Sequence, residues 1–254
     1  MRVLVLANEN DAEVGLVGRR FEERGATLEL LVREDHTSWP ELAGFDALVS
    51  LGSEWSVYWD HVAAPVHTEV GFLRAAHDRG LPTFGICFGS QLLAVAHSGS
   101  VHRAAESEIG WYDVAPAPGA SATLAGPWFQ WHDDRWTPPP GAELLATSEL
   151  ANQAFRLGRT LAVQFHPEVT LDVITHWVTE GGGPVLDERG VDRDAFLADS
   201  ASRIAEVQPR TDALVDWFLE EIAGTASTSA SSASSASSSS TSASSTSASA
   251  GSSS

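Results

Sequence analysis

The sequence Thr83-Phe84-Gly85-Ile86-Cys87-Phe88-Gly89-Ser90-Gln91 decides the fold, because its pattern changes from extended to helical at the single cysteine. Residues 83–86 form a short apolar run that is typical of a buried strand, and residues 92–97 predict an apolar helix. A glycine two positions to each side of Cys87 permits a tight turn between them. The turn would project the thiol from the carboxyl edge of a sheet, above a helix N-terminus that favours the reactive thiolate. A buried, unreactive cysteine is the alternative, since Cys also behaves as a small hydrophobic residue.

Strand-like and helix-like segments alternate before this turn. Apolar runs at 3–6, 28–32 and 47–51 predict buried strands, and residues 13–24 and 66–79 have helical spacing and end at a glycine. This βαβα order is typical of a parallel sheet with helices on both faces. The chain is therefore predicted to be an α/β protein.

The second half of the chain is expected to be built from shorter pieces. After Gly110 the strand-like segments shorten and turn residues become frequent. Three further strands and two closing helices are predicted, at 143–147, 153–157, 160–165, 192–207 and 211–223.

The composition changes sharply after Gly224. Residues 225–254 contain only Ser, Ala, Thr and one Gly, and they carry no charge. Such a segment cannot bury enough apolar surface to offset its chain entropy, so we expect a disordered Ser/Ala/Thr-rich tail. Residues 1–224 are then one domain that carries the whole formal net charge of −19.

The charged residues exclude several classes of function. All 15 basic residues are arginine, against 34 acidic residues. Without lysine the chain has no Schiff-base residue and no Walker-type phosphate lysine. The acidic balance argues against nucleic acid and against anionic membrane as partners. No apolar run is long enough to span a membrane, and residues 1–7 resemble a first strand more than a signal peptide.

Cysteine and histidine usage argues against a metal enzyme. One cysteine excludes an internal disulfide and a multi-cysteine zinc site, and it fits a reducing, cytoplasmic location. The nine histidines include neither an i, i+4 pair nor an HExxH sequence. We therefore expect neither a metal nor a cofactor.

His166 is the histidine best placed to act with the thiol. It lies in Val163-Gln164-Phe165-His166-Pro167-Glu168, at the carboxyl end of a predicted strand. Residues two apart in an extended segment point the same way, so Glu168 can hold the imidazole. A thiol nucleophile needs a base, and the base needs an orienting group. Cys87, His166 and Glu168 are the candidates for these three roles.

Together the two motifs resemble the class I (triad-type) glutamine amidotransferases, with the greatest likeness to the GMP synthase-like glutaminase domain and its stand-alone relatives. The likeness covers roughly residues 1–170. Glu108-Ile109-Gly110-Trp111 and Gln130-Trp131-His132-Asp133 follow in the expected order, where the family has a strand and a loop. The resemblance implies a flavodoxin-like three-layer sandwich with a mostly parallel central sheet.

The resemblance also implies roles for individual residues. Cys87 would attack the side-chain amide of glutamine, His166 would pass a proton to the departing ammonia, and Glu168 would orient His166. The backbone N–H groups of Ser53 and Phe88 would form the oxyanion hole. The remaining residues implied to bind substrate are Gly52, Gln91 and His132.

One loop departs from the family pattern. The family usually has Gly-Gly-Pro where this chain has Gly52-Ser53-Glu54. Serine enters the positive-φ region less readily than glycine. The conformation of residues 52–54 therefore decides whether the Ser53 N–H is oriented to bind an oxyanion.

Three functions remain open at this point. The first is a glutaminase that acts alone or supplies ammonia to a separate synthetase or acceptor subunit, since no Gly-rich phosphate loop and no lysine accompany the motifs. The second keeps the triad but cleaves a γ-glutamyl amide or peptide. The third is a catalytically silent binding module of the same fold.

Overall fold

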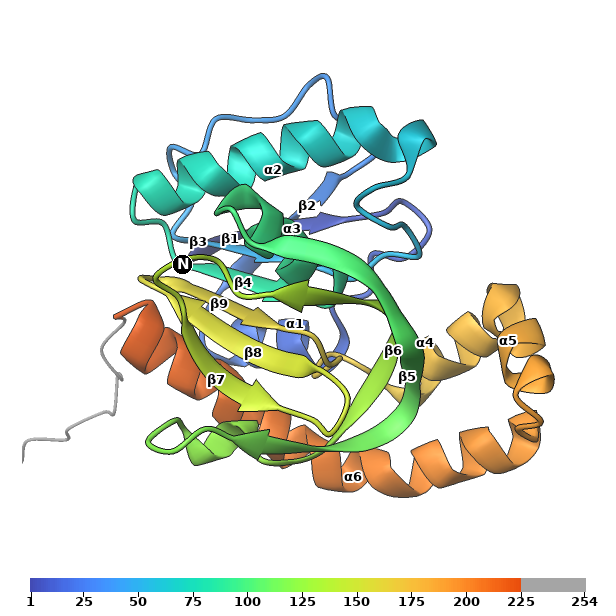
Figure 1. The fold of residues 1–254 in the computed structure, drawn as a ribbon. Helices are drawn as coiled ribbons and strands as arrows, with labels where there is room; N and C mark the ends of the chain where they lie inside the picture. The colour runs from blue at the N-terminus through green and yellow to red at the C-terminus, as the bar shows by residue number, and fades with distance from the viewer. Residues whose placement is uncertain (225–254) are drawn as a thin grey trace, which may run out of the picture.

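The computed structural model describes residues 1–224, and the predicted tail at 225–254 lies outside them. One nine-stranded sheet runs in the order β2-β1-β3-β4-β9-β8-β7-β5-β6 (Figure 1). Its strands are β1 (Arg2–Ala7), β2 (Thr27–Val32), β3 (Ala47–Ser50), β4 (Thr83–Ile86), β5 (Ser100–Pro116), β6 (Gly126–Thr137), β7 (Glu143–Thr147), β8 (Asn152–Leu157) and β9 (Thr160–Val163). The α-helices are α1 (Gly15–Glu23), α2 (Ala63–Asp78), α3 (Phe88–Ala96), α4 (Leu171–Trp177), α5 (Gly183–Glu188) and α6 (Arg193–Trp217).

The sheet is mixed, which corrects the expectation of a mostly parallel one. The four pairings that join β2, β1, β3, β4 and β9 are parallel, and the four that join β9, β8, β7, β5 and β6 are antiparallel. Helices lie between β1 and β2 and between β3 and β4, whereas short connections that cannot make a crossover join most of the antiparallel strands. The fold is therefore α/β, with a curled antiparallel part attached to a parallel part.

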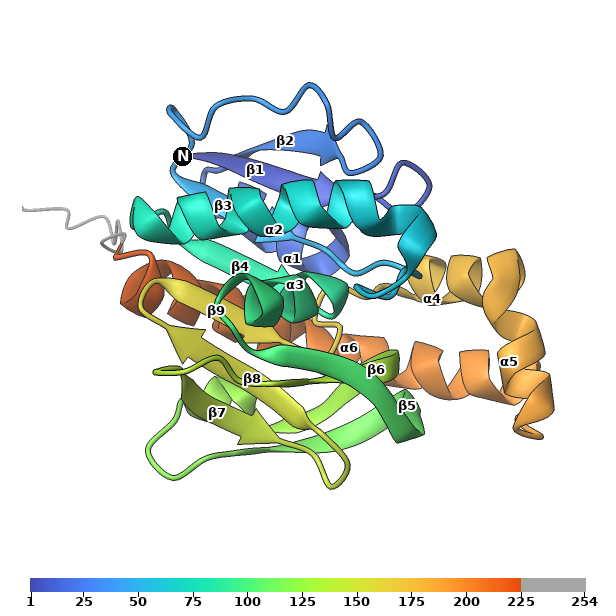
Figure 2. The same ribbon diagram turned by 45° about the horizontal axis from the view of Figure 1, so that its top comes forward.

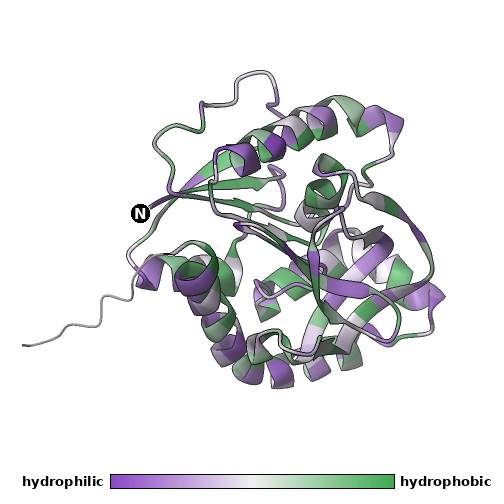
Figure 3. Cartoon of the chain, turned by 60° about the vertical axis from the view of Figure 1, so that its left-hand side comes forward, coloured by the Kyte–Doolittle hydropathy of each residue, from purple (hydrophilic) through white to green (hydrophobic). Residues whose placement is uncertain are grey.

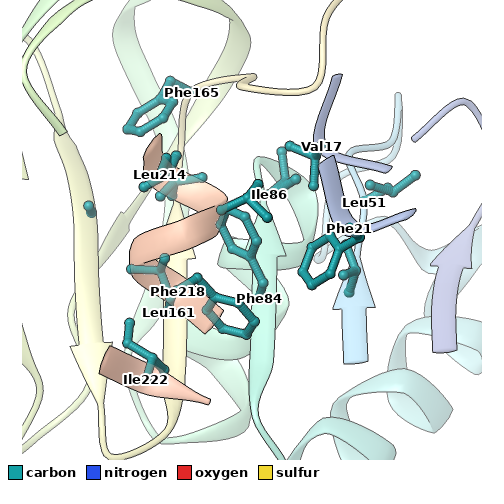
Figure 4. Packing of buried hydrophobic residues seen from close by; sticks show 14 of the residues in the cluster. Val17, Phe21, Leu51, Phe84, Ile86, Leu161, Phe165, Leu214, Phe218 and Ile222 are labelled. Carbon is teal, nitrogen blue, oxygen red and sulfur yellow. The ribbon is translucent and has the colours of Figure 1, made fainter. Parts of the chain in front are cut away.

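The parallel part has a hydrophobic cluster on each face, because alternate residues of a strand point to opposite sides. Val3 and Val5 pack in a cluster with residues of α1 and α6, whereas Leu4 and Leu6 pack in a cluster with residues of α2 and α3. Figure 2 shows α2 and α3 on the near side of these strands, and Figure 4 shows Phe84 of β4 among core residues of the first cluster. The central strands are mainly hydrophobic, and hydrophilic residues lie on the outer helix surfaces (Figure 3).

The expectation that strands shorten after Gly110 is confirmed for β7, β8 and β9, but it is wrong for β5 and β6. Gly110 lies inside β5, which pairs with β6 in a long hairpin that curls away from the parallel part (Figure 1). The pairing shifts between Arg103 and Glu108, and Gly110 has a φ of +109°, so the strand bends sharply at these points. Residues 130–133, expected in a loop, are part of β6.

The two predicted closing helices form one. Helix α6 runs from Arg193 to Trp217 through Pro209, and residues 218–222 continue it. Proline lacks an N–H and usually ends a helix. Here the following turn is held by tertiary contacts, because Thr211 donates a hydrogen bond to the Pro167 carbonyl at 2.7 Å and Leu214 is completely buried.

None of the helices within residues 1–224 is both long enough and apolar enough to cross a membrane.

Candidate active site

Cys87 occupies the sharp turn between β4 and α3. Its backbone has φ +48° and ψ −105°, a conformation that is costly for a residue other than glycine. The flanking glycines serve close packing: a Cβ on Gly85 would collide with Leu93, and one on Gly89 would collide with the Ser50 carbonyl. The Cys87 amide is fixed by a 2.8 Å hydrogen bond to the carbonyl of Val163 at the end of β9. Both strands therefore hold the thiol at the carboxyl edge of the sheet.

His166 and Glu168 follow β9 and are almost completely buried. His166 Nδ1 and Glu168 Oε1 are 2.7 Å apart, and the backbone N–H of His166 donates to the Phe129 carbonyl of β6 at 2.8 Å. The ring also packs edge-on against Trp177, with 4.9 Å between the ring centroids. This bond to Nδ1 leaves Nε2 as the nitrogen available to the thiol.

The imidazole and the thiol flank the same glycine. A Cβ on Gly52 would lie 3.1 Å from His166 Cε1 and 3.7 Å from Cys87 Cβ. Burial acts to lower the pKa of His166, but the charges of Cys87 and Glu168 and the hydrogen bond to Glu168 outweigh it, so that this pKa is raised well above its ordinary value. The charges around His166 therefore favour its protonated, imidazolium form.

A side chain outside the predicted triad contacts the sulfur. Gln164 is completely buried, and its Nε2 lies 3.6 Å from Cys87 Sγ, within reach of a weak N–H···S hydrogen bond. We did not single out this residue from the sequence. Its position two residues before His166 in an extended segment was the available signal, because both side chains then point the same way.

The loop at residues 52–54 does not need positive φ at its serine. Within residues 1–224, Cys87 and Ser98 are the non-glycine residues with positive φ, so Ser53 is unstrained where glycine was thought to be preferable. The Ser53 hydroxyl accepts a hydrogen bond from the Trp55 amide at 3.1 Å. Neither the Ser53 amide nor the Phe88 amide donates a hydrogen bond to another group of the described chain. Both are free to bind an oxyanion.

A cavity of about 360 Å³ opens above the thiol. Five of the predicted site residues line it: Ser53, Cys87, Gln91, His132 and His166. The other three, Gly52, Phe88 and Glu168, are not among its lining residues. Four tryptophans also line it: Trp55, Trp59, Trp131 and Trp177. The carboxylates in its wall are Asp11, Glu54, Asp133, Asp134 and Glu180, against a single arginine, Arg103.

Gln91 and His132 differ in how free their side chains are. Gln91 is 3 % exposed, and within residues 1–224 its side chain has no hydrogen-bond partner, so it can bind a ligand. The His132 ring nitrogens lie 3.0 Å from the Asp134 carbonyl and 3.1 Å from Gln130 Oε1. His132 therefore faces the cavity with both nitrogens already engaged. The described residues contain no group of three metal-ligating side chains.

Comparison with known proteins points to one family. A family model described as "Glutamine amidotransferase class-I" matches residues 16–180. The GMP synthase [glutamine-hydrolyzing] of Xanthomonas axonopodis pv. citri is 33% identical over 171 residues, which cover 61% of this chain and 31% of that protein. The GMP synthase [glutamine-hydrolyzing] of Stenotrophomonas maltophilia (strain K279a) gives the same identity and coverage. The matching part thus spans about a third of the length of these relatives.

Solved structures show the same likeness over more of the chain. A glutamine amidotransferase from Thermotoga maritima has a TM-score of 0.78 and 25% identity, covering 87% of this chain and 98% of that one. A glutamine amidotransferase from Methylobacillus flagellatus has a TM-score of 0.76 at 22% identity, covering 86% and 93% of the two chains, and shows the shared fold. The family model covers well over half of the sequence. The chain therefore belongs to the class-I glutamine amidotransferase family.

Proposed function

We propose that Cys87, His166 and Glu168 form a catalytic triad that hydrolyses the side-chain amide of glutamine. The observation that carries this proposal is the pairing of His166 with Glu168, beside the same glycine as Cys87, at a strained turn that opens into a cavity. A buried, unreactive cysteine would need neither the charged partner nor the strained backbone.

The proposed reaction has two stages. The Cys87 thiolate attacks the amide carbon, and the N–H groups of Ser53 and Phe88 bind the resulting oxyanion. The His166 imidazolium gives its proton to the departing nitrogen, which leaves as ammonia, and a γ-glutamyl thioester remains on Cys87. His166 then takes a proton from water, whose oxygen attacks the thioester carbon. The C–S bond breaks, releasing glutamate and restoring the thiolate beside the imidazolium.

Other parts of the chain support this reaction. We propose that the parallel half of the sheet, with helices on both faces, is the flavodoxin-like three-layer unit that carries the site. Gly52 and Gln91 are proposed to contact the substrate's amino-acid part, and His132 to shape the cavity wall beside it. A separate synthetase subunit is proposed to consume the ammonia, and no cofactor or metal takes part. The free thiol suits the reducing cytoplasm, where we place the reaction.

A second candidate, hydrolysis of a γ-glutamyl amide or peptide, is favoured by the cavity. Its tryptophan walls suit a leaving group larger than ammonia. Five carboxylates against one arginine suit a leaving amine with a positive charge. The triad chemistry is the same, with the amine leaving in place of ammonia.

Glutamate release tests both candidates. We expect the purified chain to release glutamate from glutamine. The kcat/KM for glutamine is then compared with the kcat/KM for the γ-glutamyl amide of a diamine, measured under the same conditions. A higher kcat/KM for the γ-glutamyl amide assigns the second function. Failure to hydrolyse either compound, together with no labelling of Cys87 by an electrophilic glutamine analogue, would favour the silent binding module.

Replacing Glu168 by glutamine is expected to move the pH profile in a known direction. The carboxylate raises the pKa of His166, so its neutralisation lowers that pKa and the imidazolium loses its proton at a lower pH. The alkaline limb of kcat/KM therefore shifts to lower pH, and kcat falls by roughly 10²–10⁴-fold. The control is Glu180→Gln in the cavity wall, which leaves the limb in place. An unchanged limb in Glu168→Gln would contradict the orienting role.

A further inference from the structure

Arg33 is a completely buried arginine directly after β2, outside the cavity. Its Nε and Nη2 donate to the Glu69 carboxylate of α2 at 2.6 and 3.3 Å, and Glu69 is also completely buried. The Ser50 hydroxyl donates to the same carboxylate at 2.7 Å. A buried ion pair carries a large desolvation cost and is weak evidence for stability, so its placement calls for another explanation.

The guanidinium reaches from this ion pair to the loop that precedes the thiol. Its Nη2 donates to the Leu51 carbonyl and its Nη1 donates to the Gly52 carbonyl, each at 3.2 Å. Nη1 also donates to Asn8 Oδ1 at 2.5 Å, and the guanidinium carbon lies 5.0 Å from the centroid of the Phe88 ring. One buried cation therefore touches both segments that carry the proposed oxyanion-hole amides.

Peptide geometry connects this contact to the oxyanion hole. The Gly52 carbonyl and the Ser53 N–H belong to one planar trans peptide, so they point in opposite directions. With the carbonyl directed at Arg33, the N–H points away from the guanidinium. Ser53 lines the cavity while Arg33 does not, and the α-carbon of Gly52 faces His166 and Cys87. This places the N–H on the side away from the guanidinium, in a residue that lines the cavity of the thiol.

We propose that Arg33, held by Glu69, is a positioning residue that orients the Ser53 N–H in the oxyanion hole. This inference rests on the proposed function, because orienting the Ser53 N–H matters only if the reaction forms an oxyanion. It also accounts for the altered loop sequence: Gly52-Ser53-Glu54 lacks the proline that stiffens the Gly-Gly-Pro loop, and two hydrogen bonds from a fixed guanidinium restrict it instead.

The test replaces the whole ion pair, since removing one partner would leave an uncompensated buried charge. In the double variant Arg33→Met/Glu69→Met, methionines of similar length fill the space, and the unfolding midpoint establishes that the chain is folded. The matched control is Arg2→Met/Glu29→Met, which removes an exposed ion pair between β1 and β2. Arg33→Lys keeps a cation beside Glu69 that reaches fewer carbonyls.

Two rates are then compared in each variant. Iodoacetamide alkylates the thiolate by displacement at a saturated carbon, without an oxyanion, and Cys87 is the single cysteine that can react. In the double variant we expect kcat for amide hydrolysis to fall about 10²-fold or more while alkylation and KM change only a few-fold. Arg33→Lys is expected to recover part of the loss in kcat, and the surface control is expected to equal the wild type.

The outcomes separate this inference from the proposed function. A wild type that hydrolyses neither glutamine nor γ-glutamyl amides would overturn both. An active wild type with an equally active double variant would overturn the positioning role alone. So would a parallel loss of alkylation and hydrolysis, which would show general disruption of the site. If the double variant does not fold, Arg33→Lys decides: an undiminished kcat contradicts the role.

Discussion

Cys87→Ala is expected to lower the rate of glutamate release from the better substrate by about 10⁴–10⁶-fold, because the variant has no atom that can form the acyl intermediate. The measurement is a steady-state assay of glutamate release with the background of substrate alone subtracted. The unfolding midpoint should stay close to that of the wild type, since alanine occupies the same backbone conformation as cysteine.

Cys87→Ser provides the matched control for size. Its hydroxyl fills the space of the thiol but is not ionised near neutral pH, so this variant is also expected to be inactive. Hydrolysis that persists in both variants would show that the reaction takes place elsewhere on the chain, and it would remove the basis of the proposed mechanism.

His166→Asn is expected to have an effect of similar size, a loss in kcat of about 10⁴–10⁶-fold, because members of a triad act as a unit. Asparagine can still accept or donate hydrogen bonds, but it cannot shuttle a proton. The imidazolium that favours the thiolate is also lost, so alkylation of Cys87 by iodoacetamide near neutral pH should slow as well.

His176→Asn is the control for this prediction. His176 lines the same cavity but is assigned no part in catalysis, and its replacement should leave kcat within a few-fold of the wild type. Equal effects of the two replacements would contradict a special role for His166.

The parallel part of the fold was predictable because its signals are local. The strand at 83–86, the turn at Cys87 and the helix after it were all confirmed, since apolar runs and glycines act within a few residues. The long hairpin was not predictable in the same way. The register shift between Arg103 and Glu108 and the positive φ at Gly110 interrupt the alternation that marks a strand.

Helix α6 was divided wrongly because tertiary contacts outweighed a local signal. Pro209 argues for a break, but the turn after it is held by Thr211 and by the buried Leu214. No property of residues 207–211 alone shows these partners, which come from distant parts of the chain.

The candidate site also contains residues that the sequence indicates and one that it does not. Cys87, His166 and Glu168 were identified from two motifs; in the structure His166 pairs with Glu168 and lies beside the same glycine as Cys87. Arg33 gave no signal, because an isolated arginine after a strand is typical of a surface position. Its partners Gly52 and Glu69 are 19 and 36 residues away in the sequence, so the contact can be recognised only in the three-dimensional structure.

Detection of the acyl-enzyme tests the central claim most directly. The chain is mixed with its better substrate, quenched in acid within the first turnovers and digested, and the peptide that contains Cys87 is examined by mass spectrometry. The account predicts a γ-glutamyl group on Cys87 that hydroxylamine removes, as expected for a thioester, and that is absent from His166→Asn. An unmodified Cys87 during active turnover would contradict it.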